Sequence, residues 1–189
     1  MSKIKNVDYD PKTGIFYKHN YKSDFYLAEK IIELYPNVST VADLGAGKGI
    51  YCKFFEENSN WVIEGYEGNK DACENKENKN MYNYDLTKDL KIDRKYDLVI
   101  CLEVGEHIPK KFQNVFIENV TKLTKNHLIL SWAVPKQGGK GHVNCLSNEK
   151  VIDLIINKGF LYDEEKSIIL RKNSTLKFFK NTIMTFSRN

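Results

Sequence analysis

The chain of 189 residues is 41% hydrophobic and 12% aromatic, which indicates one folded globular domain and excludes a disordered chain. Its formal net charge of +4 comes from lysines and arginines spread among acidic residues, which disfavours a nucleic-acid-binding surface. No stretch has the pattern of a signal peptide or a membrane-spanning helix, so we expect a cytoplasmic protein that does not bind membranes.

The predicted elements alternate between helices and strands from residue 23 onward. A helix is expected over 23–35, with Ser23 as its N-cap and Pro36 marking its end. The strand Thr40–Leu44 follows, and a glycine-rich turn leads from it into a helix over 49–58. Residues 70–79 are predicted to be helical or loop-like. The other expected elements are strands over 61–66, 80–84, 96–102, 127–133, Phe160–Tyr162 and 182–187, and helices over 109–123 and 147–158.

This alternation predicts an α/β fold, in which a doubly wound, mostly parallel sheet carries helices on both faces. In such sheets, ligands bind beyond the carboxyl ends of the strands. Acidic residues stand at the carboxyl ends of four consecutive predicted strands, at Asp43, Glu67, Asp85 and Glu103. A purely structural sheet does not need an acid at each of these positions, so we expect a ligand site there.

The glycine-rich turn, with Gly45, Gly47 and Gly49, allows positive φ angles and a close approach of the backbone to a ligand. Lys48 is followed by Gly49-Ile50 instead of Ser or Thr, which excludes a phosphate-binding P-loop. Asp43 would repel a pyrophosphate but would attract a positively charged amino group. The turn therefore favours a ligand that carries an amino group.

Glu67 and Asp85 indicate that this ligand also contains a nucleoside. Glu67 follows the second strand of the predicted sheet. Its distance along the chain from Asp43 is close to the offset of roughly 20 residues at which a carboxylate binds ribose hydroxyls in nucleotide-binding folds. Asp85 could accept a hydrogen bond from the exocyclic amine of adenine while its apolar neighbours cover the ring. The structural alternatives are a turn residue before Gly68-Asn69 for Glu67, and an N-cap or Asx turn for Asp85. A nucleoside joined to an amino acid fits all of these positions.

The segments 41–49, 65–69, 84–87 and 96–108 together resemble the successive motifs of class I S-adenosylmethionine-dependent methyltransferases, over about residues 40–135. The resemblance implies a Rossmann-like, seven-stranded sheet with an antiparallel last strand. It also implies S-adenosylmethionine (SAM) as the cofactor and S-adenosylhomocysteine (SAH) as its product. The cofactor would then contact Asp43, Gly45, Ala46, Gly47, Glu67, Gly68, Asp85, Leu86 and Glu103.

The chain length and the lack of any composition break predict that this methyltransferase domain is single and spans residues 1–189. Within it, residues 1–39 would form an N-terminal arm and helix, 40–135 the cofactor-binding core, and 136–189 a substrate-side loop with the C-terminal strands. Tyr17, Tyr21 and Lys22 of the arm are candidates to close over the cofactor, or else they only pack.

Two histidines are candidates for the catalytic base. His107 ends the run Glu103-Val104-Gly105-Glu106-His107, which looks like the Glu-His pair of small-molecule methyltransferases, and His142 lies in a glycine-rich loop. A hydroxyl acceptor needs a base near neutral pH, which an imidazole supplies, with Glu106 or Glu103 to orient it. The structural alternatives are that His107 only shapes the cofactor pocket and that His142 is an exposed loop residue.

The residue spacing does not favour a metal site, so we expect none. The four cysteines form no CxxC pair, which argues for free thiols rather than structural zinc. A divalent cation held by Glu103, Glu106, His107, His142 or Asn144 is the alternative. The loop 138–141, with Lys136 and Lys140 beside it, is a candidate lid over the acceptor, although its lysines could equally serve only to solvate the loop.

These features predict an O-methyltransferase that acts on a hydroxyl of a small molecule or a saccharide, including a glycan. Methylation of RNA or protein is the second hypothesis, and it would require a basic face or an added recognition domain. A non-catalytic binding module with this fold is the third, and the acids kept at every cofactor position argue against it. The sequence identifies neither the acceptor nor the oligomeric state.

Overall fold

The computed structural model describes residues 9–10, 12, 15–16, 22–74 and 76–189, so Tyr17 and Tyr21 lie outside the described residues. Two short strands, β1 (Tyr9–Asp10) and β2 (Ile15–Phe16), form an antiparallel pair. The main sheet is built from β3 (Thr40–Leu44), β4 (Val62–Glu67), β5 (Met81–Asn83), β6 (Tyr96–Cys101), β7 (Thr124–Leu130), β8 (Phe160–Tyr162) and β9 (Met184–Arg188).

The strand order in the main sheet is β5-β4-β3-β6-β7-β9-β8. Strands β3 to β7 pair in parallel, whereas β9 is antiparallel to both β7 and β8. The order reverses direction at β3, which lies between β4 and β6, and this is where ligands bind in doubly wound sheets. The predicted seven-stranded, mostly parallel sheet with an antiparallel last strand is therefore confirmed.

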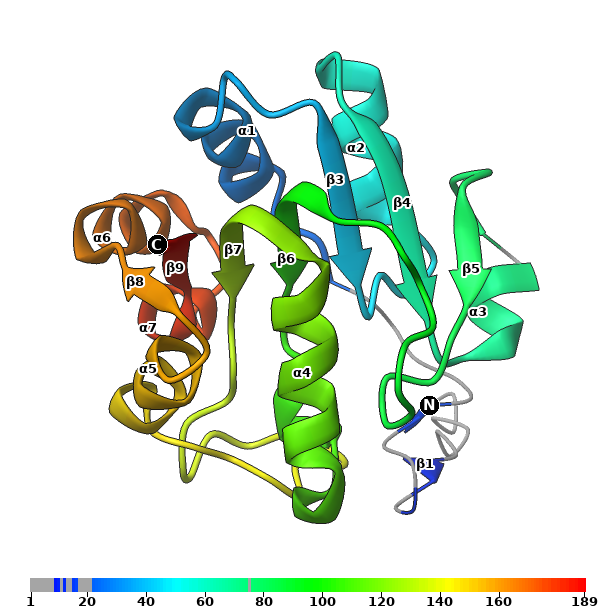
Figure 1. Ribbon diagram of the computed structural model, residues 1–189, viewed down its shortest axis with the longest axis vertical. Helices are drawn as coiled ribbons and strands as arrows, with labels where there is room; N and C mark the ends of the chain where they lie inside the picture. The colour runs from blue at the N-terminus through cyan, green and yellow to red at the C-terminus, as the bar shows by residue number, and fades with distance from the viewer. Residues whose placement is uncertain (1–8, 11, 13–14, 17–21, 75) are drawn as a thin grey trace, which may run out of the picture.

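Helices cover both faces of this sheet (Figure 1). The α-helices are α1 (Phe25–Leu34), α2 (Ile50–Asn58), α3 (Lys70–Glu74), α4 (Gln113–Leu123), α5 (Asn148–Ile156), α6 (Glu164–Asn173) and α7 (Phe179–Thr182), and the 3-10 turns are η1 (Gly105–His107) and η2 (Lys110–Phe112). Helices α4 and α5 share one core cluster with Ala42 and Leu44, whereas α1, α2, α6 and α7 share the other with Val41. Because side chains alternate along a strand, β3 contributes to both cores and is buried between them.

Four sequence predictions need correction. The N-cap of α1 is Asp24 instead of Ser23, because the Asp24 carboxylate accepts a hydrogen bond from the Leu27 N–H (3.2 Å). Strand β7 begins at Thr124, three residues before the predicted start at His127. Helix α6 was not predicted, and Thr182 belongs to α7 instead of the last strand.

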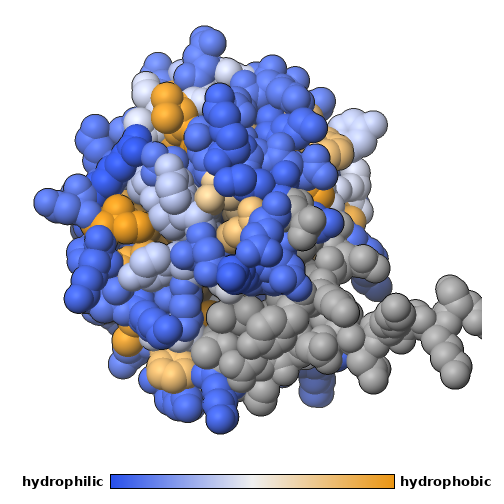
Figure 2. Space-filling model, turned by 90° about the vertical axis from the view of Figure 1, so that its right-hand side faces the viewer, coloured by the Kyte–Doolittle hydropathy of each residue, from blue (hydrophilic) through white to orange (hydrophobic). Residues whose placement is uncertain are grey.

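The exposed hydrophobic side chains do not form a continuous patch on the face drawn in Figure 2. Outside the grey residues, orange spots are separated by hydrophilic surface on that face. Among the described residues, no helix has both the length and the apolar character that a bilayer span requires.

Asp24 joins the start of α1 to the segment that follows α6. Its second carboxylate oxygen accepts hydrogen bonds from the Ser174 hydroxyl (2.7 Å) and from the N–H groups of Thr175 (2.6 Å) and Leu176 (3.0 Å). We expect Asp24→Ala to lower the free energy of unfolding by about 2–4 kcal/mol, because it removes the helix cap and leaves buried donors unpaired. Urea denaturation measures this change. Glu29→Ala, at an exposed position of the same helix, is the control, and equal loss in both variants would contradict the prediction.

Candidate functional site

The turn between β3 and α2 is shaped by glycines in the left-handed region. Gly45, Gly47 and Gly49 have φ angles of 78°, 59° and 76°. The Gly45 N–H donates to the Tyr66 carbonyl (2.7 Å), and a Cβ atom at Gly45 would lie 2.3 Å from Cγ2 of Val104. A side chain at Gly45 is therefore excluded by both conformation and space.

A cavity of about 510 Å³ opens beyond the carboxyl ends of the parallel strands. This size is within the range of small-molecule sites. The predicted site residues that line the cavity are Asp43, Gly45, Ala46, Glu67, Gly68, Asp85, Leu86, Glu103, Glu106, His107 and His142. Gly47 does not line the cavity, but its N–H donates a hydrogen bond to Glu67, which does. Lys22, Ser23, Tyr51 and Phe178 also line the cavity. Of these four residues, only Lys22 was predicted to contact the ligand.

Asp43 is a buried carboxyl group at the end of β3, only 4% exposed. Burial is the main cause that raises its pKa from 3.8 to about 7, and the nearby negative charge of Glu67 adds to the increase. The Cys52 thiol donates a long hydrogen bond to its Oδ2 atom (3.6 Å) and acts in the opposite direction. A cationic ligand in the cavity would stabilise the charged form of this group.

Glu67 holds the glycine turn and its own turn together. Its Oε2 accepts from the Gly47 N–H (2.8 Å), and its Oε1 accepts from the Asn69 N–H (2.7 Å). Burial raises the pKa of Glu67, while these backbone hydrogen bonds act in the opposite direction. Each oxygen has a second lone pair, so this carboxylate is able to accept two further hydrogen bonds from a ligand.

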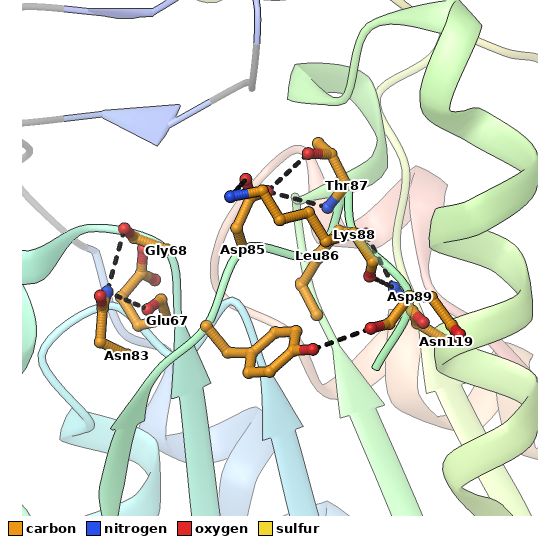
Figure 3. A network of polar contacts seen from close by, with 10 residues as sticks. Glu67, Gly68, Asn83, Asp85, Leu86, Thr87, Lys88, Asp89 and Asn119 are labelled. Atoms are coloured by element: carbon orange, nitrogen blue, oxygen red, sulfur yellow. Dashed lines mark hydrogen bonds and ion pairs between the residues drawn. The ribbon is translucent and has the colours of Figure 1, made fainter. Parts of the chain in front are cut away.

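Asp85 forms an Asx turn, which is the structural alternative considered from the sequence. Its Oδ1 accepts from the N–H (2.9 Å) and the hydroxyl (2.6 Å) of Thr87. Figure 3 shows this turn beside Glu67, with Leu86 between them and the α4 helix. The buried Asn119 of α4 fixes the loop, because its amide group donates to the carbonyls of Leu86 (2.9 Å) and Lys88 (2.8 Å).

Glu103 lies directly after β6 with a positive φ of 56°, which is rare for a residue with a side chain. Its backbone N–H donates to the Ser131 hydroxyl (2.8 Å), and its carboxylate accepts from Ser131 (2.9 Å) and Gln137 (3.0 Å). These contacts compensate for the strained conformation and tie the loop after β6 to the residues after β7.

The same two loops bring His107 and His142 together, with ring centroids 4.9 Å apart. The backbone N–H groups of Val143 and Asn144 both donate to the Glu106 carbonyl, at 2.9 and 3.0 Å. The Nδ1 atom of His107 lies 3.0 Å from the Gly141 carbonyl, and that of His142 lies 3.2 Å from the Gln137 carbonyl. Backbone carbonyls therefore orient both rings. The prediction that Glu106 or Glu103 orients them was wrong.

The Glu106 side chain is completely buried beside these rings. Neither of its carboxyl oxygens has a hydrogen-bond partner among the described residues. Burial is the main cause that raises its pKa well above the usual range, and the Glu103 charge is the next. The Glu103 carboxyl and the Ala133 backbone lie close enough to act on this pKa, but neither meets the Glu106 oxygens with hydrogen-bond geometry, and a buried carboxyl in this state is costly.

Gly105 positions this cluster against Trp132. A Cβ atom at Gly105 would lie 2.3–2.5 Å from three ring carbons of the fully buried Trp132. We expect Gly105→Ala to lower the free energy of unfolding by about 1–3 kcal/mol through overpacking. The matched control is Gly138→Ala, where a Cβ atom would meet nothing within 4 Å. Thermal unfolding of both variants measures the difference, and equal melting temperatures would contradict it.

Several residues that build the site were not identified from the sequence. Ser131 holds Glu103, Asn119 holds the loop after Asp85, and the Trp132 indole donates to the Asn144 carbonyl (2.6 Å). The available signal was a polar residue within an apolar pattern, as at Asn119 on the buried side of α4. Such a residue is usually held by a specific hydrogen bond.

Comparison with known proteins supplies independent findings. A family model described as a methyltransferase domain matches residues 17–154. No curated protein matches the chain in sequence.

Among solved structures, magnesium protoporphyrin IX methyltransferase from Synechocystis PCC 6803 with bound SAH matches with a TM-score of 0.66 and 18% identity, covering 92% of this chain and 90% of that one. An amino pentose methyltransferase from Micromonospora echinaspora matches with a TM-score of 0.66 and 12% identity, covering 91% of this chain and 100% of that one. The cyclase SpnF matches with a TM-score of 0.63 and 12% identity, covering 86% and 80%. At these identities the likeness concerns the fold, which also carries a cyclase.

Proposed function

The chain belongs to the methyltransferase-domain family of class I SAM-dependent enzymes, and we propose that it transfers a methyl group from SAM to a hydroxyl of a small molecule or a saccharide. The observation that carries this proposal is the composition of one cavity. Asp43 and Glu67 line it at the carboxyl ends of β3 and β4, and Asp85 lines it just after β5. The cluster of Glu106, His107 and His142 follows β6 and β7.

The acids at β3 and β4 fit SAM. A buried carboxyl with a raised pKa, at Asp43, is stabilised by the positive amino group of the ligand. Glu67 retains lone pairs for two ribose hydroxyls, and the positive φ angles of Gly45 and Gly47 let the backbone lie against the ligand. Leu86 and the Asp85 loop would contact the adenine, and Ala46, Gly68 and Glu103 complete the wall. When bound, SAM supplies a methyl group on a positively charged sulfur.

The histidine cluster would contact the acceptor. With its Nδ1–H directed to a backbone carbonyl, each imidazole carries a lone pair on Nε2, which is the atom that could take the proton of an acceptor hydroxyl. Glu106 and the loop 138–141 border the same space, and Lys140 is also in its wall. Methyl transfer needs close alignment of acceptor and donor, which a cavity enclosed by these loops provides.

The proposal is tested by incubating the protein with SAM and a panel of sugars, phenols and carboxylic acids, and by measuring SAH release. We expect release to depend on a hydroxylated acceptor. Release with carboxylic acids alone, or binding of SAM with no release for any acceptor, would contradict hydroxyl methylation.

A further inference from the structure

A carboxylate and two imidazoles converge on one point of the cavity. Ligand atoms of Glu106, His107 and His142 all lie within 4.8 Å of one another. A cation that bonds each atom at about 2.1 Å with tetrahedral angles holds them about 3.4 Å apart, so side-chain rotations that move these atoms by about an ångström complete the set. The backbone hydrogen bonds from Val143 and Asn144 to the Glu106 carbonyl already fix the two loops relative to each other.

The orientation of the rings is typical of metal-binding histidines. A carbonyl can only accept a hydrogen bond, so the contacts with Gly141 and Gln137 require hydrogen on Nδ1 of both rings. That tautomer leaves the lone pair of each ring on Nε2. Ligating histidines commonly use a backbone carbonyl in this way to fix their tautomer and direction.

Two further observations point to a ligand at this position. The carboxyl oxygens of Glu106 are fully buried and have no hydrogen-bond partner among the described residues, which a cation would supply. The lack of a side chain at Gly139 allows the His142 ring to take its position, since a Cβ atom there would lie 2.1 Å from Nε2 and 2.3 Å from Cε1 of that ring. A residue with any side chain at position 139 would therefore displace the His142 ring and move its Nε2 atom.

We propose that Glu106, His107 and His142 bind one divalent first-row transition-metal cation, such as Mn²⁺ or Zn²⁺. Two imidazole nitrogens and one carboxylate oxygen favour these ions over Mg²⁺ and Ca²⁺, which prefer oxygen ligands. Three protein ligands leave open coordination positions on the side of the cavity, as in catalytic metal sites. This assignment differs from the expectation drawn from residue spacing, which gave no reason for a metal.

The use of this cation in catalysis rests on the proposed function, whereas its binding does not. A cation held by Glu106, His107 and His142 would make an acceptor hydroxyl at an open position more acidic. The acceptor oxygen loses its proton to water and forms the new bond to the methyl carbon, while the carbon–sulfur bond breaks and sulfur keeps its electron pair. With the cation bound, the imidazoles would serve as its ligands, and water would replace them as the proton acceptor of the proposed function.

Titration of the metal-free protein with Mn²⁺, followed by electron paramagnetic resonance, tests the binding directly. We expect one Mn²⁺ per chain. Glu106→Gln and His142→Asn should each weaken binding by about a hundredfold, because each removes one of three ligands. Glu118→Gln and His127→Asn are matched controls outside the cavity and should bind as the wild type does.

A second pair of variants leaves all three ligands in place. Gly139→Ala should weaken Mn²⁺ binding by displacing the His142 ring, and Gly138→Ala should not. A wild-type protein that binds no Mn²⁺ at millimolar concentration, or ligand variants that bind it as tightly as the controls, would overturn the proposal. SAM binding, measured by calorimetry on the same samples, separates that result from a failure of the proposed function and from misfolding.

Discussion

Replacing Asp43 with asparagine is expected to weaken SAM binding by about a hundredfold or more and, at the same time, to stabilise the free protein at pH 8. The first effect follows from the loss of a buried carboxylate beside the ligand's amino group, a type of change that costs about 2–5 kcal/mol. Isothermal titration calorimetry measures the change in dissociation constant.

The second effect follows from the pKa of Asp43, which is about 7 in the folded protein and 3.8 ordinarily. Between these values the unfolded chain has lost the proton that the folded protein keeps, so stability falls as pH rises from about 4 to 7 and is then constant. At pH 8 the loss of folding stability caused by this buried carboxyl reaches up to roughly 4 kcal/mol, and replacement by asparagine removes that loss. The gain in melting temperature should therefore be larger at pH 8 than at pH 5.

From the raised pKa of Asp43 we also predict how SAM binding by the wild-type protein depends on pH. Because the ligand's positive charge favours the ionised carboxylate, affinity should rise with pH until about pH 7 and then level off. Glu57→Gln, at an exposed position of α2, is the control and should change neither property. Tight SAM binding by Asp43→Asn would show that the amino group lies elsewhere.

His142→Asn and His107→Asn are each expected to lower kcat by about a hundredfold or more without changing the dissociation constant of SAM. The reason is that both rings border the acceptor part of the cavity and lie across the site from Glu67 in strand order. Single-turnover measurement of SAH formation, with the acceptor found in the panel, separates the chemical step from binding. His127→Asn, where the ring packs on Tyr35 outside the cavity, is the matched control.

The double variant distinguishes the two ways in which the histidines could act. If they hold one cation, removing both rings should cost no more than removing one, because the site is lost in either case. Excess Mn²⁺ should then partly restore the single variants. Normal kcat in both single variants would exclude any role of these rings in the reaction.

The sequence was sufficient for the central part of the fold. Strand β3 was predicted at its observed bounds, Thr40–Leu44, because a short apolar run before a glycine-rich turn has few alternatives. Helix α6 was missed because its apolar residues, Ile168, Ile169 and Leu170, are consecutive and not spaced as on one face of a helix. Its signals were Asp163 as the cap, followed by acidic residues in the first turn and basic ones in the last.

The site was predictable to the extent that it follows from topology. Acids at successive strand ends of a parallel sheet must lie near one another, and Asp43, Glu67 and Asp85 line one cavity. The sequence placed His107 and His142 at one candidate site, but the contact between their rings depends on backbone hydrogen bonds between loops after different strands, which no sequence pattern indicates.

Calorimetric titration of the wild-type protein at pH 8 with SAM, and separately with NAD⁺ and ATP, tests the central claim most directly. The buried carboxyl of Asp43 and the absence of a phosphate-binding lysine-serine pair in the glycine turn favour a cationic nucleoside over a pyrophosphate. We expect saturable binding of one SAM per chain and no binding of NAD⁺ or ATP. No heat of binding with SAM at millimolar concentration, or tighter binding of either pyrophosphate, would contradict the account.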